Sequence, residues 1–376
     1  MPRLNTTQHS GGLTPAYATP HGSTTLARPD VLEAITVVQS LGTPFLNRMA
    51  KAETHSANPA WLVDSFGEPW DGQGTAASDI IADKEDQDYD PAAGDSASMI
   101  GNYCHITSEG FGTTRRSRSV SQYGVGDEHA YRRYRAAIAL ARKAEYTMLF
   151  SQAAAGGYAN TSETLMSNAP KMHGLFGWGI TTGEDNTTSR TIAGHLVASR
   201  YASTFWSGPG GGSFSSDAFI NNLLQPMVLN GNELDSLVCV TSFKVKRAMS
   251  NFNSIYPGSG SHVKANEQTI SAREKSIILA TDYFETPLGT LAVSASRMLS
   301  AAPTRTQFGN SASISVDPTK SMILFDPSLM DVAVLDGPYT VDLSVDGGKS
   351  REQIILDFTL RPMNPKAIGI GLNLVP

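Results

Sequence analysis

A phosphate-binding loop is the first chemical site that the sequence suggests, because Gly347-Gly348-Lys349-Ser350 ends in the Gly-Lys-Ser pattern of such loops. The motif also requires a glycine five positions before the Gly-Lys pair, where the backbone must approach the phosphate closely. This chain has Leu343 at that position. Since strand-forming residues flank the glycines, we interpret the stretch as a hairpin turn.

A calcium loop is the second candidate, because Asp86, Asp88 and Asp90 alternate as the first ligands of such a loop do. Pro91 stands where the loop needs glycine, and Ala97 stands where it needs a bidentate glutamate. The histidines are isolated from one another, and the two cysteines are far apart in the sequence, so we interpret them as reduced structural thiols. We therefore expect no catalytic residue, no cofactor and no metal site.

Composition describes a globular chain without a strong charge bias. The chain has 376 residues, 40% of them hydrophobic, and a net charge of −6. This hydrophobic content is too high for a mostly disordered protein. The sequence has neither a signal peptide nor an apolar run of about 18 residues, so we expect no membrane span. The acidic balance disfavours a surface that wraps nucleic acid, although a basic helix face keeps that alternative open.

The first half of the chain predicts an extended start and a projecting hairpin. Residues 1–30 are rich in Thr, Gly, Ser and Pro and predict a flexible arm, followed by a short helix near 31–38. A strand at 60–66 leads into a long acidic excursion, and a return strand begins at Met99. Because so polar a segment cannot be buried in its own subunit, we expect it to meet a partner surface.

One long helix is predicted over 127–155, where the sequence contains neither Gly nor Pro before Gly156. Asp127 suits its positive N-terminal end. Its packing face is expected to carry Tyr134, Ala137, Ala141, Ala144 and Met148. Basic residues occupy its other faces.

Charge complementarity is the main functional hypothesis that the residues themselves support. The acidic excursion and the basic helix faces can be complementary surfaces of neighbouring identical subunits, because opposed charges set register and encounter rate. The alternative is that both are simply solvated. The candidate intersubunit contacts are Asp83, Glu85, Asp86, Asp88, Asp90, Arg132, Arg135 and Arg142.

The second half predicts loops, then a compact mixed region, then a hairpin. Residues 157–215 are rich in Gly, Ser, Thr and Asn and predict mostly surface loop. Alternating helix and strand patterns follow up to about residue 339. The C-terminal hairpin is expected from Thr340 to Val345, with a turn at Asp346-Gly347-Gly348 and a return strand over 353–360.

This order of parts resembles the major capsid (head) protein of tailed bacteriophages, which has the Johnson or Hong Kong-type fold. The resemblance covers most of residues 40–376. It rests on short collinear segments, namely Thr43-Pro44-Phe45-Leu46, Pro59-Ala60-Trp61-Leu62-Val63-Asp64, Ile100-Gly101-Asn102-Tyr103, Tyr123-Gly124-Val125-Gly126-Asp127-Glu128, Ser242-Phe243-Lys244-Val245-Lys246-Arg247, Tyr283-Phe284-Glu285-Thr286-Pro287-Leu288-Gly289 and Ile354-Ile355-Leu356-Asp357-Phe358 with Asn364-Pro365-Lys366-Ala367.

The resemblance implies an α+β fold and a division of the chain into parts. These are an N-terminal arm (1–60), an extended hairpin (61–125), a peripheral domain with spine helix and surface loop (126–215), an axial domain (216–339) and C-terminal strands that return to the peripheral domain (340–376).

It also implies a function without catalysis. The subunit would assemble with itself into hexamers and pentamers of an icosahedral or prolate head shell around phage DNA, which it encloses without sequence recognition. Scaffold, portal and decoration proteins are further candidate partners. The location would be the virion, after assembly in the host cytoplasm. Two alternatives remain at this point, an encapsulin-like compartment shell and a cytosolic enzyme with an unrecognised site.

Overall fold

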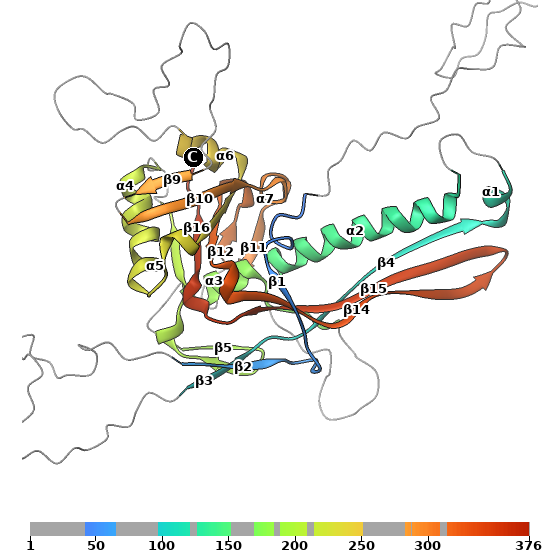
Figure 1. The fold of residues 1–376 in the computed structure, drawn as a ribbon, viewed down its shortest axis with the longest axis horizontal. Coiled ribbons are helices and arrows are strands. Elements are labelled where there is room, and N and C mark those ends of the chain that lie inside the picture. Colours follow the sequence, from blue (N-terminus) through green and yellow to red (C-terminus); the bar gives the residue numbers. More distant parts are fainter. Residues whose placement is uncertain are drawn as a thin grey trace, which may run out of the picture.

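A compact body and a long arm make up the α+β structure (Figure 1). The structure is a computed structural model, and it describes residues 42–64, 97–120, 126–151, 169–183, 189–208, 214–250, 283–286, 288–308 and 314–375. The predicted flexible arm 1–30, the helix 31–38 and the acidic excursion lie outside these residues.

The body is built on a six-stranded mixed sheet with the order β7-β16-β13-β8-β10-β9. Its central strands are apolar on both faces and fully buried, which is typical of a sheet covered on two sides. The strands are β7 (Thr204–Ser207), β8 (Val238–Thr241), β9 (Tyr283–Thr286), β10 (Gly289–Ala295), β13 (Met322–Phe325) and β16 (Ile368–Leu372).

Helices and three small strand pairs surround this sheet. The helices of the body are α3 (Leu175–Gly183), α4 (Ser216–Phe219), α5 (Gln225–Leu229), α6 (Phe243–Ser250) and α7 (Arg297–Ala301). The pairs are β2 (Ala60–Val63) with β3 (Ser98–Gly101), β5 (Arg190–Ile192) with β6 (His195–Val197), and β11 (Arg305–Phe308) with β12 (Ile314–Val316). The antiparallel β2–β3 pair confirms that the strands on either side of the acidic excursion form the base of a hairpin.

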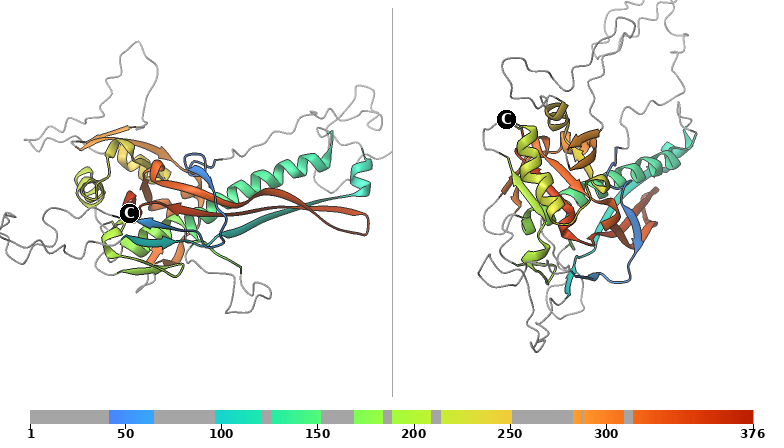
Figure 2. Two further views of the ribbon diagram at one scale, coloured as in Figure 1. Left: turned by 60° about the horizontal axis from the view of Figure 1, so that its bottom comes forward. Right: turned by 60° about the vertical axis from the view of Figure 1, so that its left-hand side comes forward.

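The arm is a four-stranded sheet, ordered β1-β14-β15-β4, with helix α2 along it (Figures 1 and 2). A tight turn joins its two longest strands, and Gly347 and Gly348 both have positive φ there, as this hairpin turn requires. The distal end of β4 continues into the short helix α1. The elements are β1 (Ala50–Glu53), β4 (His105–Thr114), α1 (Arg115–Ser119), α2 (Glu128–Phe150), β14 (Met330–Asp346) and β15 (Lys349–Pro362).

A buried amide joins arm and body where they meet. Asn102, just before β4, donates to the carbonyls of His173 and Leu360 at 3.0 and 2.8 Å, and it accepts from His173 N at 2.8 Å. These bonds satisfy both polar ends of a fully buried side chain. The body therefore fixes the root of the arm.

Four expectations from the sequence are corrected. The long helix ends at Phe150 rather than 155. The buried stripe of this helix includes Ala136 and Leu140 along with the predicted Ala144 and Met148. Tyr134, in contrast, is 59% exposed. The sheet therefore covers a helix face that is rotated by about one residue from the predicted face. The predicted surface loop 157–215 contains α3, whose Trp178 is fully buried. The C-terminal hairpin begins at Met330 rather than Thr340.

The described residues contain no helix whose length and apolar character would let it cross a bilayer. Both cysteines are buried and free.

A buried carboxyl links α2 to the segment that enters the body. Glu145 Oε2 accepts a hydrogen bond from Leu46 N at 3.2 Å, and Oε1 has no partner among the described residues. Phe45 beside it stacks on Phe325 at 5.6 Å. Burial raises the pKa of Glu145 to about 7, because the hydrogen bonds from this backbone only partly offset the lost hydration.

We predict that this carboxyl makes the protein less stable as the pH rises. Its folded pKa of about 7 lies above the unfolded value of 4.5, so the folded state holds an extra proton between the two. The contribution of Glu145 to the free energy of unfolding should therefore fall from pH 4.5 to pH 7. Denaturant titrations of the unassembled chain should show a smaller fall for Glu145→Gln, which stays neutral and keeps the acceptor oxygen. An unchanged pH slope in that variant would contradict the assignment.

Candidate assembly surfaces

The predicted cations lie on α2, but the structure gives them different surroundings. Arg132 forms an ion pair with Glu128 one turn earlier and donates to Gly112 O of β4 at 2.5 Å. Arg135 is exposed and lies 5.9 Å from the ring of Tyr131. Arg142 is half-buried. The predicted acidic contacts, Asp83, Glu85, Asp86, Asp88 and Asp90, lie outside the described residues, so the pairing stays a prediction.

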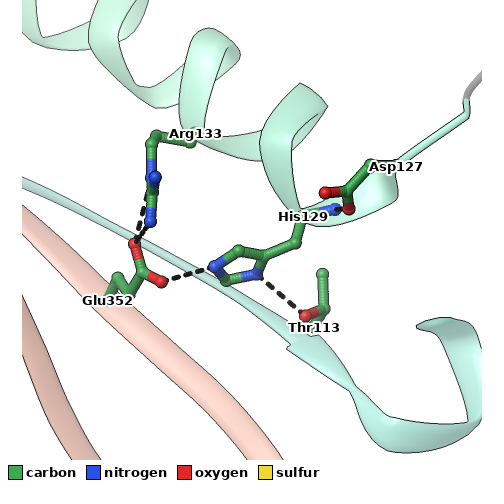
Figure 3. Close-up of polar contacts among 5 residues, drawn as sticks. All are labelled: Thr113, Asp127, His129, Arg133 and Glu352. Carbon is green, nitrogen blue, oxygen red and sulfur yellow. Dashed lines mark hydrogen bonds and ion pairs between the residues drawn. The ribbon is translucent and has the colours of Figure 1, made fainter.

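A polar cluster holds α2 on the sheet (Figure 3). Glu352 of β15 is 6% exposed and receives hydrogen bonds from Arg133 at 3.1 and 2.5 Å. Its other oxygen lies 2.5 Å from His129 Nε2, and His129 Nδ1 lies 3.0 Å from Thr113 Oγ1. Burial alone would raise the pKa of Glu352, but the bonds from Arg133 and His129 outweigh it and hold that pKa below its ordinary value. One carboxylate thus joins α2, β4 and β15.

The same cluster has the order of groups found in hydrolase triads, hydroxyl, imidazole and carboxylate. Thr113, however, is 2% exposed and lies within the sheet. A substrate carbonyl cannot reach its oxygen, so we interpret the cluster as structural. No group of His, Cys, Asp and Glu within the described ranges could hold a metal ion.

Two basic side chains of α2 cover the outer edge of β4. In an antiparallel pair, every second residue directs its N–H and C=O away from the partner strand. Lys143 Nζ donates to Ser108 O at 2.8 Å and Arg132 donates to Gly112 O. Residues 108, 110 and 112 are therefore the outward set, and these cations protect the edge from pairing with another strand. Gly110 lies between the two covered carbonyls.

Two hollows lie along this edge. The one on the helix side has a volume of about 430 Å³, and Arg132, Arg135, Ala136 and Ala139 contribute to it. The second hollow has a volume of about 420 Å³ and extends over the distal part of the sheet. Gly110 and Gly112 line both hollows.

Two glycines of β4 that face away from the helix border the second hollow. Phe111, next to them in the strand, packs against His129 of α2 at 5.3 Å between ring centroids. Strand alternation therefore turns Gly110 and Gly112 to the opposite face. On that face Arg351 lies opposite Gly112, and Leu343 lies opposite Arg351. Missing side chains on β4 thus leave space beside a cation and an aliphatic side chain.

Five cations surround the distal end of the arm, and we call them the tip cluster. The backbone brings them together, since Arg115 N at the start of α1 donates to Gly348 O of the hairpin turn at 3.1 Å. All five side chains are exposed. The tip cluster consists of Arg115, Arg116, Arg118, Lys349 and Arg351.

The residues of the tip cluster are not among the candidate contacts predicted from the sequence. From the sequence, Lys349 is interpreted only as part of a hairpin turn. The closeness of Lys349 and Arg351 to Arg115 depends on the β4–β15 register, which pairs Lys349 with Thr114. Only a pairing signal between these distant segments could have revealed it.

We predict that the Glu352 carboxylate stabilises the arm by about 1–2 kcal/mol, as hydrogen bonds from charged donors commonly do. Glu352→Gln should lower the free energy of unfolding at pH 7. Because the folded pKa of Glu352 is depressed, this stabilisation is present above the unfolded value of 4.5 and is lost as the pH falls through the folded value.

Urea titrations at pH 7 and pH 3 would measure both effects. Glu109→Gln is the matched control, since Glu109 makes a 3.5 Å pair with Lys143 and is more exposed. Equal losses for the two variants would contradict a special role for Glu352.

Known capsid structures share this fold. The cyanophage A-1(L) capsid protein is similar with a TM-score of 0.58 and 13% identity, over 94% of this chain and 99% of that chain. The capsid protein of the native GTA particle has a TM-score of 0.53 and 13% identity, over 96% of this chain and 98% of that chain. The capsid protein of bacteriophage PhiM1 has a TM-score of 0.50 and 10% identity, over 97% of this chain and 98% of that chain. The chain therefore has the α+β fold of phage capsid proteins.

Sequence comparison assigns the family. No curated protein matches the chain significantly. A family profile described as SU10 major capsid protein matches residues 14–375, which is nearly the whole chain. This match favours a structural, shell-forming role over the compartment-shell and enzyme alternatives. The chain belongs to the SU10 major capsid protein family.

Proposed function

We propose that this chain assembles with itself into hexamers and pentamers that close into the icosahedral or prolate head shell of a tailed phage. The observation that carries the proposal is the family match over residues 14–375. The arm supports it, because a sheet and helix that project from the body need neighbours to cover their exposed faces. The shell would enclose the phage DNA without recognising its sequence.

The arm and the body suggest two different positions in the shell. The arm, with α2 and the sheet β1-β14-β15-β4, would form the peripheral domain, and the six-stranded sheet would form the axial domain around the capsomer centre. The β2–β3 hairpin would extend over a neighbouring subunit. Scaffold, portal and decoration proteins would join during assembly in the host cytoplasm, and the mature protein would reside in the virion.

Light scattering after size-exclusion chromatography, followed by negative-stain microscopy, tests this assembly. We expect the recombinant chain to elute as rings or closed shells, far above the 40.1 kDa of one subunit. A chain that stays monomeric both alone and when expressed with the other head proteins of its phage would overturn the proposal. Sedimentation of the same samples gives an independent measure of particle mass.

We also propose that the acidic excursion of one subunit pairs with α2 of its neighbour. Charge reversal at Asp86 and Asp88, or at Arg132 and Arg135, should lower the yield of shells several-fold, because like charges then meet. Reversing both sets together should partly restore it. Shell yield by sedimentation measures the effect.

Arg132 needs a control, because it also holds Glu128 and Gly112 O. Arg135→Glu alone leaves those contacts intact, and unfolding temperatures would report any damage to the arm. Normal assembly of both one-sided variants would exclude this charge pairing, while the capsid assignment would stand.

A further inference from the structure

The tip cluster is a concentration of positive charge for which the described part of the chain supplies fewer carboxylates than cations. None of its five side chains has a hydrogen bond or an ion pair with another described residue. Repulsion among exposed cations opposes the compact state unless a partner supplies negative charge. The cluster therefore has the character of a docking surface.

Nearby carboxylates are already in use. Glu128 pairs with Arg132, and Glu352 holds Arg133 and His129. Asp127 Oδ1 accepts from His129 N at 2.8 Å and so caps α2. Asp342 is exposed on β14, and Asp346 of the same strand lies opposite Lys349 in the register. These two carboxylates do not balance five cations, and the remaining positive charge suits an anionic partner.

The hollow beside the cluster indicates what kind of anion fits. Lys349 and Arg351 of the tip cluster line it together with Arg132, and Leu343 and Phe111 add apolar surface. Thr114 and Ser117 also line the hollow. A site with cations beside apolar surface suits a peptide in which carboxylates alternate with apolar side chains. A bare phosphate backbone would leave the apolar part unused.

One segment of this chain has that composition. Residues 79–95 contain seven Asp and Glu but only one cation, Lys84, which gives −7 + 1 = −6. Ile80, Ile81 and Tyr89 lie among these acids. Fully extended, 17 residues span up to about 60 Å, which is long enough to follow the end of the arm.

We infer that the tip cluster and its hollow dock the acidic segment 79–95 of a second copy of this chain. The inference rests on the proposed self-assembly and extends the contact proposed for α2 to the end of the arm. A second copy is favoured over the same copy, because β2 and β3, which bracket the segment, lie beside the body, whereas the tip lies at the far end of the arm (Figures 1 and 2).

A binding measurement tests the contact without requiring assembly. A fluorescent peptide of residues 79–95 is titrated with the unassembled full-length chain, and its anisotropy is recorded. We expect saturable binding that Lys349→Glu with Arg351→Glu weakens at least about tenfold, because attraction becomes repulsion. The matched control is Lys244→Glu with Arg247→Glu, which reverses two exposed cations of α6 and should leave affinity within about twofold.

Several outcomes would overturn the inference. The first is the absence of binding up to about 1 mM peptide, a range that includes weak complexes. The second is an equal loss of peptide affinity in the tip and control variants. A further titration uses a short DNA duplex as the probe. If the tip substitutions abolish DNA binding but leave peptide binding unchanged, the cluster is a nucleic-acid site.

Assembly provides the second readout and separates this inference from the proposed function. Lys349→Glu with Arg351→Glu should reduce shell yield, and adding Asp86→Lys and Asp88→Lys in the same chain should recover part of it. If the wild-type chain never assembles, the proposed function fails whatever the peptide does. If the wild-type chain assembles but the tip substitutions leave peptide binding unchanged, only this inference fails.

Discussion

Strand β15 is the element on which the rest of the arm depends, because it is paired along both edges. It pairs with β14 from Met330 to Asp346 and with β4 along the full length of that strand. Its inward side chain Glu352 holds α2, and its first residues bring Lys349 and Arg351 beside α1. A shift of one residue in this register would turn every side chain to the opposite face. The helix contact and both hollows would then be lost together.

Much of the fold was predictable where local signals agree. Helix α2 follows from an uninterrupted run of helix formers with a capping Asp127, and the hairpin turn follows from its two glycines. The loop expected over 157–215 was wrong for α3, because glycines there serve packing rather than turns. A Cβ at Gly179 would lie 2.3 Å from Ile370, so the glycine lets helix and sheet approach closely. Sequence composition alone does not distinguish these two uses of glycine.

The candidate site was less predictable, because its charges are brought together by pairing between distant segments. The Glu128–Arg132 pair has helical spacing and was in principle visible in the sequence. The tip cluster combines α1 with the start of β15, more than 200 residues later, and only the sheet register makes them neighbours. Likewise, Tyr134 was expected to be buried because nothing in the helix pattern shows which face the sheet covers. The family resemblance compensated for this by identifying the fold as a whole.

The wide separation of β4 and β15 in the sequence also determines when the arm can form. β4 ends at Thr114, but its partner strand β15 begins only at Lys349, more than 200 residues later. A growing chain therefore carries α2 and the β4 edge without the strand that organises them, and such long-range pairing is slow. The arm cannot take its final form until β15 has been synthesised. The order of segments along the chain thus makes the arm one of the last parts of the described structure to form.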